Sequence, residues 1–217
     1  MIGMVVIIII GTLLHFTFEW SGFQEIVGVF SAVNESVWEH LKIAFMPSIL
    51  WLIIDYRYLY KRTNNFFFAK AIGIFSIMVI IPVIFYTYTI FIEHNLTIDI
   101  ISFMFAIIVG QLVSYKILTF KQLSKNLKLI SIVALIILFL AFVVFTFYPL
   151  EIPLFQDPVT GEYGIIHHLH WLQLFFQNLG LFQSKTLSIP SIPVDLTVFN
   201  PHVTQRGGAH IDAGKYY

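Results

Sequence analysis

The sequence contains no cysteine, and it is poor in charged residues. The missing thiols exclude disulfide bonds, thiolate metal sites and cysteine nucleophiles. Only 11% of the 217 residues are Asp, Glu, Lys or Arg, whereas a soluble domain usually has about a quarter. Because the net charge is zero, the composition gives no electrostatic support for a nucleic-acid partner. These shortages indicate a chain whose surface mostly faces lipid.

Several motifs that would reveal a reaction are missing as well. The chain has no phosphate-binding loop, no G-x-G-x-x-G segment, no G-x-S-x-G nucleophile elbow and no H-E-x-x-H zinc motif. It begins with an apolar run, but it lacks the basic segment and the small-residue cleavage site that mark a signal peptide. We therefore predict that this run is kept as the first membrane helix.

What the chain has instead is long apolar runs, since 58% of its residues are hydrophobic. A membrane-spanning helix needs about 20 mostly apolar residues. Five segments meet this requirement, at residues 2–19, 41–60, 71–92, 98–118 and 129–150. The sequence therefore predicts an all-α membrane protein, in which residues 1–150 form a bundle of five transmembrane helices.

The basic residues predict how this bundle is oriented. Eight of the twelve cluster in two connections, after the second and the fourth predicted helix: Arg57, Lys61, Arg62 and Lys70, then Lys116, Lys121, Lys125 and Lys128. Basic connections stay in the cytoplasm, so we predict a cytoplasmic N-terminus. All eight histidines and eleven of the twelve acidic residues then fall on the outer side. We expect a multi-pass protein of the cell membrane, with the lipid bilayer as its partner.

The character of the chain changes after residue 150. Residues 151–164 are rich in Pro, Gly and Asp, which predicts an outer turn segment. Residues 165–183 place apolar side chains on one helical face and His, Gln and Asn on the other, which favours an interfacial amphipathic helix over a sixth span. We expect residues 184–217 to form a polar, extended tail. Contacts with a second copy or with a membrane-complex partner are expected through residues 165–217.

The densest polar segment is SAVNESVWEHLK, at residues 31–42. Much of it is typical of a helix start, because Asn34 is a good N-cap residue and Ser36 with Glu39 has capping-box spacing. One cap does not explain the remaining ionisable groups. Glu35 and Glu39 are one helical turn apart, where like charges repel unless a cation or a proton compensates.

A second pair of ionisable residues lies at the same membrane level. His15 and Glu19 are one turn apart at the outer end of the first predicted span. We therefore predict a polar cluster of His15, Glu19, Asn34, Glu35, Ser36, Glu39, His40, Lys42 and Asp157. Within it, His15, Glu19, Glu39 and His40 are candidate ligands of a divalent metal such as zinc, which histidine and carboxylate groups suit. We also expect His15 and Glu39 to lie within hydrogen-bond reach. The alternative is a helix cap combined with a lock between helices, and no catalytic residue is assigned.

Two segments resemble an uncharacterised family, of unknown function, of small bacterial multi-pass membrane proteins. They are VNESVWEHLK at residues 33–42, followed by Pro47, and PLFQDPVTGEYG at residues 153–164, with His15 ending the first span. The resemblance covers residues 1–165. It implies a membrane location and a shared outer motif, but no activity.

Three functions remain open from the sequence. The first is a structural or assembly component whose tail docks a partner. The second is a protein that binds or transports a cation or proton through the outer cluster. The third is a membrane-embedded, metal-dependent hydrolase, with a metal held by His15, Glu39 and His40.

Overall fold

The computed structural model describes residues 2–124 and 126–165, and this part of the chain is helical. Its elements in order are α1 (Ile2–Trp20), α2 (Glu25–Gly28), α3 (Val37–Leu59), the 3₁₀ turn η1 (Tyr60–Arg62), α4 (Phe66–Tyr88), α5 (Leu96–Leu118) and α6 (Asn126–Phe147). Within the described residues, β-structure is limited to one isolated bridge between Gln156 and Tyr163. Helices α1, α3, α4, α5 and α6 are long and apolar enough to cross a membrane. The predicted all-α bundle with five spans is confirmed.

Several helix boundaries differ from the prediction, and the starts of α3 and α4 differ for a clear physical reason. Helix α3 begins at Val37 rather than at residue 41, because Ser36 caps it and its polar first turn is already helical. Helix α4 begins at Phe66, before the predicted start at residue 71. A charged residue at position 70 suggested a connection there, but Lys70 lies within α4 and forms a partly buried ion pair with Asp55 of α3. The short helix α2 was not predicted.

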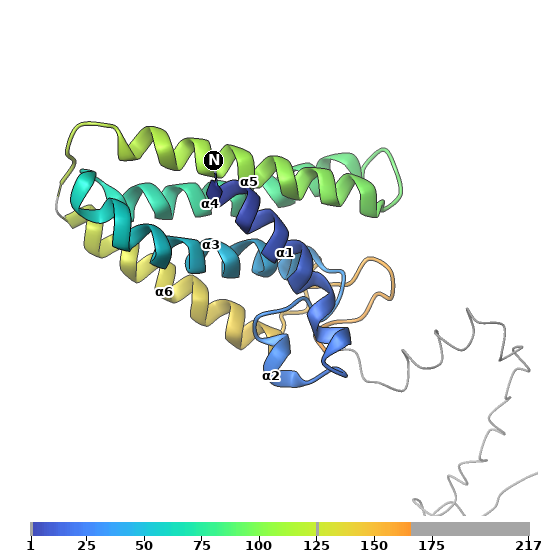
Figure 1. Ribbon diagram of the computed structural model, residues 1–217. Helices are drawn as coiled ribbons and strands as arrows, with labels where there is room; N and C mark the ends of the chain where they lie inside the picture. Colours follow the sequence, from blue (N-terminus) through green and yellow to red (C-terminus); the bar gives the residue numbers. More distant parts are fainter. Residues whose placement is uncertain (1, 125, 166–217) are drawn as a thin grey trace, which may run out of the picture. The chain divides into compact units, whose positions relative to one another are not determined.

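Helix α3 is the centre of the bundle (Figure 1). Of its apolar window, 72% is buried, against 22–39% for the other four long helices. Helices α1 and α4 pack directly on it, and α6 reaches it through the rings of Phe45 and Phe142, whose centroids are 5.0 Å apart. The most extensive packing joins α4 to α5, which run side by side (Figure 1).

Two glycines explain why α4 and α5 approach so closely. A Cβ atom on Gly73 would lie 2.7 Å from the carbonyl oxygen of Gly110. A Cβ atom on Gly110 would lie 2.6 Å from the carbonyl oxygen of Gly73. Real side chains do not tolerate such distances from a backbone, so these two positions let the helix backbones touch.

The segment after α6 folds back onto the start of α3. The backbone N–H of Trp38 donates to the Leu154 carbonyl at 3.0 Å, and Asn34 Nδ2 donates to the Gly164 carbonyl at 2.8 Å. The Trp38 ring also packs against Phe155, with centroids 4.7 Å apart. The predicted interfacial helix at 165–183, apart from its first residue, and the predicted tail at 184–217 lie outside the described residues. The predicted sidedness of the bundle stays a prediction.

Candidate metal-binding site

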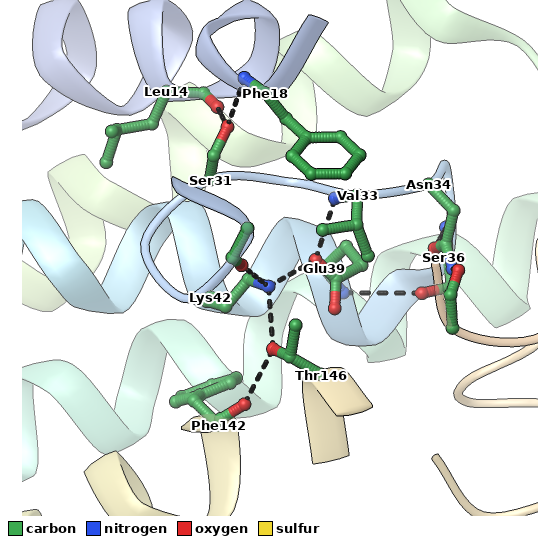
Figure 2. Close-up of polar contacts among 12 residues, drawn as sticks. Leu14, Phe18, Ser31, Val33, Asn34, Ser36, Glu39, Lys42, Phe142 and Thr146 are labelled. Carbon is green, nitrogen blue, oxygen red and sulfur yellow. Dashed lines mark hydrogen bonds and ion pairs between the residues drawn. The ribbon is translucent and has the colours of Figure 1, made fainter. Parts of the chain in front are cut away.

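Helix α1 is fixed against its neighbours at the turn that carries His15. At Gly11, one turn earlier, a Cβ atom would lie 2.8 Å from the Ile43 carbonyl oxygen of α3, so glycine permits close contact there. The Ser31 hydroxyl accepts from Phe18 N at 2.9 Å and donates to the Leu14 carbonyl (Figure 2). These are the two groups that an uninterrupted helix would join. The loop before α3 is therefore attached to the α1 turn that presents His15.

The loop itself is held by side chains of the predicted motif. Ser36 Oγ accepts from Glu39 N at 3.4 Å, so Ser36 is the N-cap of α3, and Asn34 Oδ1 accepts from Ser36 N at 2.9 Å. The return half of the predicted capping box is not formed, because the Glu39 carboxylate accepts from Val33 N instead. Glu35 N donates to Asp157 Oδ2 at 3.1 Å. The backbone on both sides of Glu35 is thereby fixed, and with it the position of its carboxylate.

Glu35 lies between two histidines that come from different helices. Its Oε2 is 3.3 Å from His15 Nε2 of α1 and 3.8 Å from His40 Nε2 of α3. Together, one ligand atom from each of the three residues lies within 4.8 Å of the others. Atoms bound to one tetrahedral zinc at about 2.0–2.1 Å stand roughly 3.3–3.4 Å apart. A small movement of the three side chains toward one another would therefore bring their ligand atoms to the spacing found around a tetrahedral zinc ion.

The hydrogen bonding of His40 leaves one ring nitrogen facing the cluster with a lone pair. His40 Nδ1 lies 2.9 Å from the Ser36 carbonyl oxygen, which can only accept, so Nδ1 carries a proton. In the neutral ring, Nε2 is then an acceptor directed toward Glu35. A bond from the other ring nitrogen to a backbone carbonyl is the arrangement that orients histidine ligands in metal sites.

The His15 imidazole and the Glu35 carboxylate each have an atom without an aligned hydrogen-bond partner among the described residues. Within the described part of the chain, the buried atoms His15 Nε2 and Glu35 Oε2 have no aligned hydrogen bond, although they are close together. Burial by itself would raise the pKa of Glu35, but interaction with His15 and the charges of further histidines hold that pKa below its usual value. The carboxylate is therefore anionic at neutral pH. An anion that faces two imidazole nitrogens is completed by a cation, either a metal or a proton.

Glu39, which was predicted as a metal ligand, does not belong to this group of converging atoms. Its Oε2 lies 2.6 Å from Lys42 Nζ and accepts from Val33 N at 3.0 Å (Figure 2). Lys42 Nζ also donates to the Gly28 carbonyl at 2.7 Å and to Thr146 Oγ1 of α6 at 2.9 Å. Lys42 is three positions from Glu39 and seven from Glu35, and it pairs with Glu39. Glu35 therefore takes the place beside His15 that was predicted for Glu39.

Two other predicted residues lie near the cluster without joining it. Glu19 borders a cavity of ≈ 30 Å³ together with His15 and Glu35, but it is outside the ligand group. Asp157 is buried, and its Oδ1 accepts from Val159 N at 2.7 Å and Thr160 N at 3.0 Å. Asp157 therefore organises the turn that follows it and links this turn to the backbone of Glu35.

The prediction missed a second histidine–carboxylate pair beside this site. His94 Nε2 lies 2.8 Å from Asp99 Oδ2, and Tyr88 OH donates to Asp99 Oδ1 at 2.6 Å. Asp99 shares a cavity of ≈ 60 Å³ with His15 and His40. A signal was present, because a carboxylate inside a predicted span is a functional candidate by default. Asp99 is the second residue of the span predicted at 98–118, and no role was predicted for it.

The comparisons with known proteins give a family but no function. No curated protein and no solved structure matches the chain. A model of a family of unknown function, DUF6512, matches residues 1–165. The matched range contains both segments that suggested a family, all five long helices and the complete cluster. The chain therefore belongs to the family of unknown function DUF6512.

Proposed function

We propose that this membrane protein binds a divalent transition metal, with zinc as the first candidate, through His15, Glu35 and His40. The observation that carries the proposal is the convergence of two imidazole groups and one carboxylate within 4.8 Å. Two histidines and a glutamate form a known zinc ligand set. The orientation of His40 by the Ser36 carbonyl supports the same conclusion, since it directs Nε2 into the group.

The ligand number favours an open site over a closed structural one. Structural zinc sites usually have four protein ligands, whereas catalytic sites have three and leave one position for water or substrate. The described residues supply three ligands, and the cavity of ≈ 60 Å³ borders both histidines. A bound metal would there act as a Lewis acid on an oxygen that enters the cavity.

An architectural role is the second candidate, and a different observation favours it. The buried Glu39–Lys42 pair connects the start of α3 to the loop at Gly28 and to Thr146 of α6. This network alone gives the motif a function in assembling the bundle. It does not involve His15 or Glu35, so both roles are compatible in one protein.

Zinc titration of the purified, metal-free protein tests the proposal. In a mild detergent, calorimetry should show one zinc bound per chain. Glu35→Gln and His40→Ala should each weaken binding by more than the roughly 10–100-fold that loss of an outer partner causes. Glu19→Gln is the matched control, because this nearby carboxylate is outside the ligand group and should leave binding unchanged.

Two results would contradict the proposal. If the wild-type protein binds no zinc, cobalt or other divalent transition metal, the cluster is an ion pair that shares a proton. If Glu19→Gln abolishes binding as completely as Glu35→Gln, the metal has a different ligand set.

A further inference from the structure

We infer that the metal site receives a single-chain amphiphile, which enters from the side between α1 and α5. Its polar end would reach the metal while its acyl chain stays at the surface of the bundle. This inference rests on the proposed metal site and names the class of molecule that the site takes.

The first observation is the position and size of the cavity beside the site. It lies between the two histidines on one side and residues of α5 on the other, among them Asp99 and Phe103. Its volume of ≈ 60 Å³ is enough for a few water molecules. A small polar headgroup therefore fits in this space.

The second observation is the apolar rim of the cavity. Phe16 of α1 and Leu96 and Ile100 of α5 border it, and they are 43%, 49% and 47% exposed. Both helices are long and apolar enough to cross a membrane. Exposed apolar side chains on such helices face acyl chains rather than water. The rim therefore admits a molecule from the lipid phase, and a chain lying along it stays in an apolar environment.

The third observation is a buried carboxylate on the opposite wall. Asp99 is 5% exposed, and its Oδ2 has no aligned hydrogen bond within the described residues, although His94 Nε2 is 2.8 Å away. Tyr88 holds the other oxygen at 2.6 Å. A charged group in an apolar span is expensive to maintain, and it usually marks a binding pathway. Asp99 is placed to accept a hydrogen bond from a headgroup whose oxygen binds the metal.

These three observations define the ligand chemistry. The headgroup carries an oxygen that can bind a metal and, next to it, an N–H or O–H that donates to Asp99. The remainder is an acyl chain. Alkyl hydroxamates have this combination, and they bind metals through their oxygens, so they are suitable probes.

The experiment compares octanohydroxamate with acetohydroxamate on the cobalt-loaded full-length protein in detergent. The visible spectrum of cobalt reports only on headgroups that reach the metal, and not on probe dissolved in micelles. Each methylene buried from water strengthens binding about fourfold. Detergent micelles compete for the acyl chain of the probe and reduce this gain. Octanohydroxamate should still bind at least about tenfold more tightly than acetohydroxamate.

Two variants of the bundle surface provide the matched comparison. Ile100→Ser changes the rim of the cavity and should bring the ratio of the two affinities close to one. Ile137→Ser changes an equally apolar, exposed residue of α6 that does not border the cavity, and it should keep the wild-type ratio. Asp99→Asn should weaken the binding of both probes by a similar factor, since Asp99 lines the part of the cavity that would hold the headgroup. If Ile100→Ser does not retain the cobalt spectrum, Leu96→Ser replaces it.

The outcomes separate this inference from the proposed function. Equal affinities in the wild-type protein would overturn the amphiphile inference and leave the metal site intact, with its ligand arriving from the aqueous side. An unchanged ratio in Ile100→Ser would overturn the lateral entrance. Failure of cobalt and zinc to bind at all would overturn the metal site itself, and the inference with it.

Discussion

Glu35 and Glu39 are the same residue type, one helical turn apart in sequence, yet their surroundings are opposite. Glu39 is 2% exposed and paired with Lys42, which is fully buried and also bonds to Gly28 and Thr146. Glu35 lies between two imidazole nitrogens at 3.3 Å and 3.8 Å. The first carboxylate belongs to a network in which the lysine protons have acceptors. The second belongs to a group that needs a cation.

This difference separates the architecture of the motif from its chemistry. A buried ion pair with complete hydrogen bonding holds helices together, and losing one partner leaves an uncompensated charge. Buried polar groups that converge with incomplete hydrogen bonding are instead candidates for a binding site. We therefore propose a structural role for Glu39 and Lys42, and a binding role for His15, Glu35 and His40.

The largest expected effect comes from breaking the Glu39–Lys42 network. Glu39→Ala leaves the Lys42 ammonium buried and unpaired, and it should lower the free energy of unfolding by about 3–5 kcal/mol. The measurement is chemical unfolding in a mild detergent. The double variant Glu39→Gln with Lys42→Met should recover most of the loss, because it removes both charges and keeps similar volumes. If the double variant is as unstable as Glu39→Ala, the charge argument is wrong.

The next effect concerns zinc-linked stability. Zinc at 100 times its dissociation constant should stabilise the wild-type protein by about 2.7 kcal/mol, because it binds the folded state. Glu35→Gln should lose this zinc-dependent gain while staying folded without metal. Thermal unfolding with and without zinc measures both quantities. A zinc response that survives in Glu35→Gln and disappears in the Glu39/Lys42 double variant would reverse the two roles.

The smallest effect should come from Ser36, which serves the helix and not the metal. Ser36→Ala removes the cap of α3 and should lower stability by about 1 kcal/mol. The His40 imidazole is oriented by the Ser36 backbone carbonyl, which remains in the variant. Zinc affinity should therefore change little. A large loss of zinc binding in Ser36→Ala would show that the cap and the site cannot be separated.

Composition and local spacing were sufficient to predict the five helices and the Ser36 cap. They could not decide which glutamate joins the histidines, since Glu35 and Glu39 are chemically identical. That choice depends on Lys42, which pairs with Glu39 and also donates to Thr146. Thr146 lies 104 positions after Lys42 in the chain. The start of α4 could not be predicted either. The charge of Lys70 suggested a connection, and only the structure shows that Asp55 lies beside it and pairs with it. Asp99 was visible in the sequence, but its proximity to His15 and His40 arises only from the packing of α1, α3 and α5.

X-ray absorption spectroscopy of the zinc-loaded protein is the most direct test of the central claim. The account predicts zinc bound by nitrogen and oxygen at about 2.0–2.2 Å, with the scattering signature of two imidazole rings. Glu39→Gln with Lys42→Met should leave that spectrum unchanged, whereas His40→Ala should reduce it to one ring. A zinc spectrum without imidazole, or one that changes with the Glu39/Lys42 pair and not with His40, would contradict the assignment.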